Sequence, residues 1–260
     1  MGEVPHRHRS RAGEAGAAEL TSAASDRRSA VASRAGRSPG AWALFVGLIV
    51  ALLAADLGLK AWSFANVAQR PVVLVSDAEW ERQLSAGGTD PRVMTLPVRY
   101  ANQELAGARA ITLIPHGLSL RLTTNDGAVF GLGSGGRWAF VAFSALAVVV
   151  IGFLFWRSDR RAGVFHVGLA LVLGGALGNL YDRLIYGVVR DMLHLFPGVA
   201  LPYGWQWPGG GNGLYPWIFN LADVFLLAGV AVITLASMDS RRAAAAQESA
   251  SGGDEPAEQA

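Results

Sequence analysis

The sequence predicts an all-α membrane protein with four transmembrane helices and a small extracytoplasmic β-rich domain between helices 1 and 2. Of its 260 residues, 52% are hydrophobic and only 16% are charged, whereas about 25% are charged in an average soluble domain. Four segments are apolar enough to cross a bilayer, which takes about 20 helical residues. Several β-prone runs separated by Gly, Pro and Asn lie between the first two segments. The absence of Cys excludes disulfides, a thiolate nucleophile and Cys-based metal sites.

The four predicted spans differ in the polar residues that they contain. They are Ala41–Trp62, Trp138–Trp156, Ala162–Tyr181 and Pro216–Met238. The second span has no charge and carries a Trp at each end, where amphipathic rings favour the headgroup region. The first contains Asp56 and Lys60, the third contains His166, and the fourth contains Asp223. A membrane interior disfavours charge, so the two charged spans require an explanation.

Basic residues near the spans predict the orientation of the chain. Seven Arg lie in the first forty residues, three lie between the second and third spans, and Arg241 and Arg242 follow the fourth. Because cytoplasmic loops carry an excess of Lys and Arg, we expect both termini in the cytoplasm and residues 63–137 and 184–215 outside. An alternative is a signal peptide cleaved near residues 63–65, which the long basic leader and the charges inside the first span argue against.

The chain is predicted to form one membrane domain between two tails. Residues 1–40 and 239–260 are rich in small and polar residues and have no apolar period, so we expect disordered cytoplasmic tails there. The membrane domain covers residues 41–238 and includes the β-rich insert, residues 63–124.

The outward segments contain short local patterns. The β-prone runs of the insert are Arg70–Ser76, Val93–Tyr100, Arg109–Ile114 and Leu118–Thr124. Asp77–Leu84 has the pattern of a short amphipathic helix. The second outward segment ends in PYGWQWPGGGNGLYPW, whose Gly, Trp and Tyr content predicts a mobile loop that favours the membrane interface.

Polar side chains at the depth of the spans form four clusters. A charge at the bilayer centre costs from about 2.5 to more than 10 kcal/mol, so each cluster is a candidate functional site. The clusters are Asp56 with Lys60, Asn125 with Gly127, Asn179 with Asp182 and Arg183, and Asn220 with Asp223. Asp191 follows eight positions after Arg183. The predicted topology brings all of these residues toward the outer side of the membrane.

Each cluster also has a purely structural interpretation. Asp56 and Lys60, at positions i and i+4, can neutralise each other inside lipid. The Asn179 cluster can join helices through hydrogen bonds, Asn220 can cap the fourth helix, and Gly127 can be a turn residue. One further group of small residues can allow close approach of helices: Gly174, Gly175 and Gly178.

Asp191 and Asp223 are harder to explain as structural residues, because neither has a basic partner on its own face. Two unpaired carboxylates at one depth can share a proton, since repulsion raises the pKa of one while the other stays ionised. Such a pair can provide the general acid and the general base that activate water for attack on an amide. The spacing alone leaves the catalytic and the structural interpretation equally open.

The order of these motifs resembles the lipoprotein signal peptidase family (signal peptidase II), whose members are intramembrane aspartyl proteases. The matching stretches are DLGLKAW at 56–62, IPHGLSLRLTTNDGAVFGLG at 114–133, GGALGNLYDRLIYGVVRDML at 174–193 and WIFNLADVFLLAG at 217–229. The resemblance implies that Asp191 and Asp223 are the catalytic aspartates. It implies that a further set of residues positions the substrate and supports the site: Asp56, Lys60, Asn125, Gly127, Asn179, Asp182, Arg183 and Asn220.

The resemblance also implies a reaction and its setting. The family removes the signal peptide from a diacylglyceryl-modified prolipoprotein just before the lipidated Cys, with no metal and no organic cofactor. The expected partners are this substrate and membrane lipids, with no nucleic acid, and the expected form is a monomer. The expected location is the bacterial inner (cytoplasmic) membrane, with the active site near the outer leaflet.

Three features depart from the family pattern. The basic N-terminal tail is longer than the family needs. The insert is enlarged, since Asn125 follows Lys60 by 65 positions, and it can therefore alter substrate choice. Arg190 precedes Asp191 where the family has an apolar residue, and Met192 replaces an aromatic one. We expect Arg190 to lower the pKa of Asp191 and activity to survive.

Two functions outside the protease class compete with this interpretation. A small transporter or proton-relay protein would need inverted repeats and broken helices near the midplane, and the halves of this chain show no similarity. A catalytically inactive membrane scaffold would not need the intact Asp191 and Asp223. Other protease classes are disfavoured, because the sequence lacks the H-E-x-x-H, G-x-S-x-G and G-x-G-D motifs.

Overall fold

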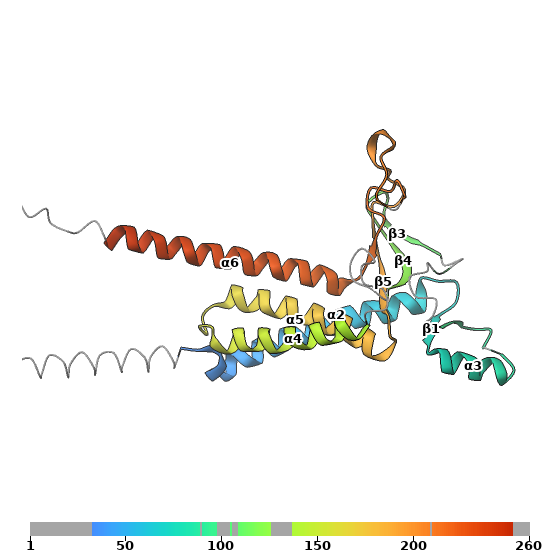
Figure 1. Cartoon of the computed structure of the whole chain (residues 1–260), viewed down its shortest axis with the longest axis horizontal. Coiled ribbons are helices and arrows are strands. Elements are labelled where there is room, and N and C mark those ends of the chain that lie inside the picture. Colours follow the sequence, from blue (N-terminus) through green and yellow to red (C-terminus); the bar gives the residue numbers. More distant parts are fainter. Residues whose placement is uncertain are drawn as a thin grey trace, which may run out of the picture.

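Four long helices form the body of the protein (Figure 1). The computed structural model describes residues 33–88, 90–97, 105, 109–125, 137–208 and 210–251. Within these ranges the long helices are α2 (Pro39–Asn66), α4 (Arg137–Arg157), α5 (Gly163–Ile185) and α6 (Leu221–Ser251). Each of the 4 is long and apolar enough to cross a membrane, which confirms the predicted spans.

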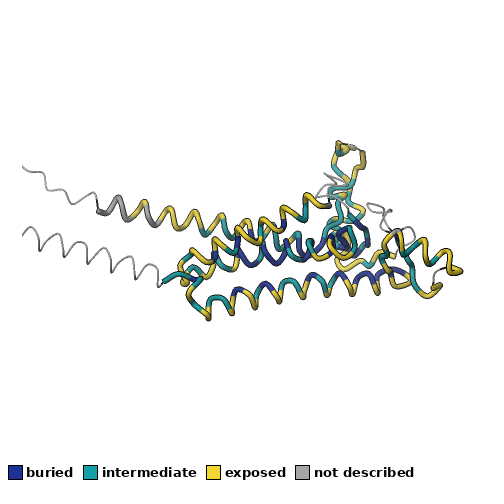
Figure 2. The backbone as a smooth tube through the Cα atoms, turned by 60° about the horizontal axis from the view of Figure 1, so that its bottom comes forward, coloured by how far each residue is buried: buried dark blue, intermediate teal, exposed yellow. Residues whose placement is uncertain are grey.

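Helix α5 is the centre of the bundle, because it contacts α2, α4 and α6. In its membrane-spanning window 50% of the residues are buried, against 17% for α2 and α4 and 11% for α6. Small residues allow this packing: a Cβ on Gly174 would lie 2.9 Å from Leu52 Cβ, and one on Gly175 would collide with the Ala222 carbonyl. The predicted role of these glycines is confirmed. Exposed residues follow the outer helices along much of their length (Figure 2), and many of them are large and apolar, as expected where lipid covers a helix.

Local sequence determines where the helices begin. Before α2, the Ser38 side chain accepts a hydrogen bond from the Ala41 amide at 3.3 Å, and Pro39 occupies the first helical position. Before α6, Asn220 Oδ1 accepts from the Asp223 amide at 3.1 Å, and Asp223 Oδ2 accepts from the Asn220 amide at 3.2 Å. This reciprocal cap fixes the Asp223 carboxylate in the first turn of α6.

Two small sheets lie at one end of the bundle (Figure 1). The larger, antiparallel sheet has the strand order β3 (Ile111–Ile114), β4 (Leu118–Asn125), β5 (Val189–Leu195) and β6 (Ile218–Phe219). In the smaller sheet, β1 (Val72–Val75) pairs in parallel with β2 (Met94–Pro97). Helix α3 (Asp77–Ser85) lies between these two strands in the sequence. Each predicted β-prone run thus contains a strand, although residues 98–100 lie outside the described residues.

The larger sheet joins two outward segments of the chain. Strand β4 belongs to the insert between α2 and α4, whereas β5 follows α5, and the two strands pair along their length. The β-rich insert, residues 63–124, therefore supplies only β3 and β4 of this sheet, and β5 and β6 come from the second outward segment. The insert shares a core with the end of α2 and with β5, formed in part by Phe64, Val67, Leu120, Leu122 and Met192. This core holds β5 against the bundle.

The packed structure extends into both predicted tails. Ala35 is fully buried, and its amide donates to the Ser158 carbonyl at 2.9 Å, so the N-terminal tail ends before residue 40. Helix α6 continues to Ser251, where the sequence predicts disorder from residue 239. The Ala run after Arg242 explains this difference, because Ala has the highest helix propensity. Residues 1–32 and 252–260 lie outside the described residues.

Candidate active site

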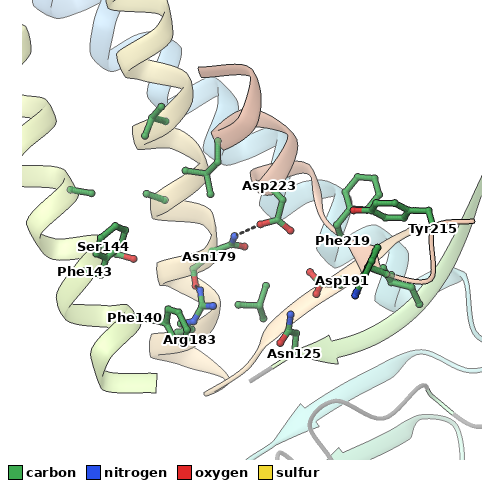
Figure 3. A pocket seen from close by; sticks show the side chains of 17 residues that line it. Asn125, Phe140, Phe143, Ser144, Asn179, Arg183, Asp191, Tyr215, Phe219 and Asp223 are labelled. Atoms are coloured by element: carbon green, nitrogen blue, oxygen red, sulfur yellow. Dashed lines mark hydrogen bonds between the residues drawn. The ribbon is translucent and has the colours of Figure 1, made fainter. Parts of the chain in front are cut away.

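Asp191 and Asp223 come from different elements and face the same cavity. Asp191 lies in β5, opposite Thr123 of β4, and Asp223 lies in the first turn of α6. Both line a cavity of about 430 Å³ that α4, α5, α6 and the larger sheet enclose (Figure 3). The fold therefore brings together two carboxylates that are far apart in the sequence.

Asn220 connects these two carboxylates. Its Nδ2 donates to Asp191 Oδ1 at 2.6 Å and to Asn179 Oδ1 at 3.0 Å, while its Oδ1 caps the Asp223 amide. Asn179 Nδ2 in turn donates to Asp223 Oδ1 at 2.8 Å. The Asn125 side chain also forms a hydrogen bond with Asp191. The predicted cap at Asn220 is thus confirmed, and the same side chain also contacts the aspartate pair.

Burial raises the pKa of Asp191 well above its usual value of 3.8, and the negative charge of Asp223 raises it further. The hydrogen bond from Asn220, the positive charge of Lys60 and the hydrogen bond from Asn125 oppose this rise without cancelling it. Asp191 therefore keeps its proton to a higher pH than an exposed carboxyl group does.

Arg190 does not lower the pKa of Asp191, so this expectation from the sequence is wrong. Successive residues of a strand point to opposite faces, and Arg190 points to Asp182. Its Nη2 lies 2.8 Å from Asp182 Oδ1, and its amide donates to Asp182 Oδ2 at 3.0 Å. Its guanidinium also lies 4.5 Å from the centroid of the Tyr186 ring. The strand geometry thus turns this charge away from the cavity.

Lys60 is the centre of a second group of charges, which we call the Lys60 cluster: Asp56, Lys60, Asp182 and Arg190. The Lys60 Nζ lies 2.8 Å from Asp56 Oδ2 and 3.2 Å from Asp182 Oδ2. The first of these contacts confirms the predicted Asp56–Lys60 pair. Lys60 also donates to Asn179 Oδ1 at 3.1 Å, which links the cluster to the hydrogen bonds of Asp223.

The Lys60 cluster lies where α2, α5 and α6 meet. Asp56 Oδ1 accepts from the Ala222 amide at 3.0 Å, and a Cβ on Gly178 would collide with the Asp56 carboxylate. Lys60, Asp56 and Asp182 are fully buried. None of the four cluster residues is among the described residues that line the cavity. The cluster therefore lies outside the cavity and holds in place two groups next to it, the Asn179 side chain and the start of α6.

The cavity has a polar end and an apolar end. Asp191, Asp223, Asn125 and Asn179 form the polar end. The apolar part is lined by side chains from three spans: Phe140, Phe143, Ala147, Val172, Ala176 and Leu226. Arg183 lines the cavity as well, with its guanidinium 4.7 Å from the centroid of the Phe140 ring. The cavity thus offers hydrogen-bonding groups and an apolar surface to one ligand.

A family model described as signal peptidase (SPase) II matches residues 93–239, which is more than half of the chain. The chain belongs to the signal peptidase II family. It is therefore a protease with membrane-spanning helices, which favours the protease interpretation over the transporter and scaffold alternatives.

Two lipoprotein signal peptidases are similar to this chain over a little less than half of its length. The lipoprotein signal peptidase of Latilactobacillus sakei is 37% identical over 129 residues, which cover 48% of this chain and 72% of that protein. That of Burkholderia mallei is 40% identical over 119 residues, which cover 44% of this chain and 63% of that protein. A bacterial membrane enzyme solved by the in meso method at 2.3 Å resolution has a TM-score of 0.48 and 20% identity, covering 76% of this chain and 89% of that chain.

Most of the predicted site residues of this signal peptidase lie together. Those that line the cavity are Asp191, Asp223, Asn125, Asn179 and Arg183. Those that lie behind it are Asp56, Lys60, Asp182 and Asn220. Gly127 lies outside the described residues, together with the rest of the matching stretch after Asn125, residues 126–133.

The aromatic wall of the cavity was not predicted. Tyr215, Trp217 and Phe219 all line the cavity, and the Tyr215 ring lies 5.2 Å from Trp217 and 5.9 Å from Phe219 between centroids. Their spacing of two residues, which places them on one side of an extended segment, was the available signal. Burial, and then the charge of Asp223, raises the pKa of Tyr215, so its hydroxyl stays protonated. Ser144 of α4 was missed too, because no pattern distinguishes it within an apolar helix.

Proposed function

We propose that this chain is a membrane aspartyl endopeptidase that removes the signal peptide from diacylglyceryl-modified prolipoproteins and cleaves before the lipidated Cys. One observation carries the proposal: Asp191 and Asp223 face one cavity, where burial and the charge of Asp223 raise the pKa of Asp191. The names of the relatives, which are lipoprotein signal peptidases, support this class of substrate.

In the proposed reaction, a water molecule between the two carboxyl groups attacks the carbonyl carbon of the scissile peptide bond. Asp223 acts as the general base and takes a proton from this water, while Asp191 acts as the general acid and protonates the carbonyl oxygen. When the tetrahedral intermediate collapses, its hydroxyl returns a proton to Asp191, and Asp223 delivers its proton to the leaving amine. Both carboxyl groups regain their initial state, and one water is consumed.

The surrounding residues orient this pair in the proposed mechanism. Asn179 and Asn220 each donate to one aspartate and also contact each other, so they fix the two carboxyl groups relative to one another. The Lys60 cluster fixes Asn179 in turn. Asn125 and Arg183 face the cavity and are the proposed contacts for the polar part of the substrate. The resemblance assigns Gly127 to the same role.

The proposed substrate matches the two ends of the cavity. Its peptide would occupy the polar end, and its acyl chains would occupy the apolar part among α4, α5 and α6. One chain supplies both aspartates, so the proposed enzyme acts as a monomer. We place it in the bacterial cytoplasmic membrane with both termini in the cytoplasm, because the Arg-rich connection between α4 and α5 lies at the end of the bundle opposite the sheets (Figure 1).

The test is cleavage of a diacylglyceryl-modified prolipoprotein by the purified chain in detergent, with a chelator present throughout. We expect Asp191→Asn and Asp223→Asn to abolish cleavage before the modified Cys. Asp159→Asn is the matched control, because Asp159 is exposed and lies after α4, far from the cavity, and it should cleave at the normal rate. Persistent cleavage by either site variant would refute the assigned pair, whereas a folded parent that cleaves none of several prolipoproteins would refute the reaction.

A further inference from the structure

The segment between β5 and β6, described at residues 196–208 and 210–217, forms a hairpin-like arm that extends away from the sheet (Figure 1). We call it the aromatic arm. Ala200 and Gly213 form an antiparallel bridge, and the Leu201 amide donates to the Asn212 carbonyl at 2.7 Å. The Trp207 indole N–H donates to the Gly213 carbonyl at 2.9 Å. These bonds hold the two sides of the aromatic arm together.

The tip of the aromatic arm, which lies beyond the bond between Leu201 and Asn212, presents two aromatic side chains outward. Tyr203 is 93% exposed and Trp205 is 67% exposed. The aromatic arm contains no Asp, Glu, Lys or Arg. Large aromatic side chains contribute to stability mainly when they are buried, so these two contribute little to the folded chain itself.

The backbone of the aromatic arm is strained where it presents these side chains. Tyr203 has φ 59° and ψ 18°, and Phe196 at the base of the arm has φ 50°. A left-handed conformation is unfavourable for a non-glycine residue. Residues with such strain are concentrated in segments that serve a function, so the strain at Tyr203 makes the aromatic arm a candidate for one.

The direction of the aromatic arm identifies this contact. The arm runs across the axes of the helices and lies beside the sheet end of the bundle (Figure 1). The surface of a membrane crossed by the four spans lies at the ends of those helices, so the arm runs along this surface. Trp and Tyr favour this interface, where the ring contacts acyl chains and the N–H or O–H reaches the headgroups.

We propose that the aromatic arm docks on the lipid bilayer, with Tyr203 and Trp205 inserted at the level of the headgroups. The proposal rests on the four membrane spans and is independent of the peptidase reaction. The inner rings of the arm continue to the cavity, since Trp207 lies 4.6 Å from Trp217, and Trp217 lies 5.2 Å from Tyr215, between ring centroids. Docking of the tip thus holds the aromatic wall of the cavity at the membrane surface.

The absence of Cys in the chain allows a direct measurement of depth. Single cysteines are introduced by Trp205→Cys at the tip, by Leu227→Cys on the exposed face of α6, and by Ala86→Cys after α3, and each carries a nitroxide spin label. The full-length variants are reconstituted into vesicles of phosphatidylcholine and phosphatidylglycerol. Electron paramagnetic resonance then compares collisions of the label with lipid-soluble oxygen and with a water-soluble nickel complex.

We expect the ratio of oxygen to nickel collisions at position 205 to be several-fold higher than at position 86 and lower than at position 227. A label at position 203, introduced by Tyr203→Cys, should give the same intermediate value. Ratios at positions 203 and 205 equal to that at position 86 would overturn the proposal. Because the readout does not depend on cleavage, failure of the proposed peptidase reaction would leave it unaffected.

A second variant tests whether the tip side chains themselves cause the docking. Adding Tyr203→Asp to the Trp205→Cys chain places a charge beside the label, and the interface disfavours such a charge. The collision ratio at position 205 should then fall toward the value at position 86. An unchanged ratio would contradict docking through these side chains. The exposed position of Tyr203 makes the substitution compatible with folding.

Discussion

The Lys60 cluster and the aspartate pair are neighbouring groups of charged side chains that differ in how their charges are balanced. In the Lys60 cluster, two cations balance two carboxylates at distances of 2.8 to 3.2 Å, and the group is closed to the cavity. Asp191 and Asp223 instead accept hydrogen bonds from amide groups and face the cavity. A buried charge kept for structure is neutralised by a partner. In the aspartate pair no cation from the described part of the chain lies at ion-pair distance, and burial together with the charge of Asp223 raises the pKa of Asp191.

The largest expected effect on stability comes from removing the central cation of the Lys60 cluster. Lys60→Met leaves Asp56 and Asp182 buried with one cation fewer, so the free energy of unfolding should fall by about 3–5 kcal/mol. Thermal or denaturant unfolding in detergent measures this change. Arg92→Met is the matched control, because its 2.7 Å ion pair with Asp90 is exposed, and it should leave stability unchanged. A Lys60→Met chain as stable as the control would remove the distinction between the two groups.

The two groups also differ in how much of their arrangement the sequence could predict. Asp56 and Lys60 lie one helical turn apart, so their pairing follows from local spacing alone. The contact between Arg190 and Asp182 crosses from a strand to a helix. It depends on where α5 ends and β5 begins, which a single sequence does not determine, so the sequence did not identify Asp182 as the partner of Arg190.

The same difference between local and distant interactions applies to the fold. The spans and most strands were predictable because apolar runs and turn residues act locally. The pairing of β4 with β5 was not, because it joins segments on either side of two spans. The role of Asn220 was only half predictable, since capping is local while its bond to Asp191 is not.

A smaller effect is expected from Gly178→Ala, which disturbs the Lys60 cluster through packing. The new Cβ would collide with the Asp56 carboxylate, whose position Lys60 fixes, so we expect a loss of about 1–3 kcal/mol in the free energy of unfolding. Gly152→Ala in α4 is the matched control, since its Cβ would meet nothing within 4 Å, and it should stabilise by about 0.5–1 kcal/mol. Equal stability of the two variants would contradict tight packing at Asp56.

A larger side chain in the cavity wall should lower the rate of cleavage even though both aspartates are unchanged. Ser144→Phe adds a ring to the cavity wall formed by α4, so kcat/KM should fall by at least about tenfold, or about 1.4 kcal/mol of transition-state stabilisation. Ser144→Ala, which leaves the cavity open, should cleave at the normal rate. Cleavage kinetics with the lipidated substrate measure both variants. An unaffected Ser144→Phe enzyme would show that the substrate lies elsewhere.

The smallest expected effect is a pH dependence of stability with a definite sign. Because the pKa of Asp191 is raised from 3.8 on folding, the folded chain binds more protons than the unfolded chain above this pH. The free energy of unfolding therefore falls as the pH rises from about 4 through the folded pKa. Asp191→Asn removes this contribution, so its melting temperature relative to the parent should increase with pH. A difference that is constant from about pH 4 to about pH 8 would contradict the raised pKa.

The most direct test measures the cleavage rate and the melting temperature on the same preparations of Asp223→Asn and Lys60→Met. We predict opposite outcomes for the two variants. Asp223→Asn should cleave about 10⁴-fold or more slowly than the parent and melt at the same temperature as the parent. Lys60→Met should melt at a lower temperature than the parent. If Asp223→Asn cleaved at the normal rate, or melted as early as Lys60→Met, the assignment of one group to chemistry and the other to structure would be contradicted.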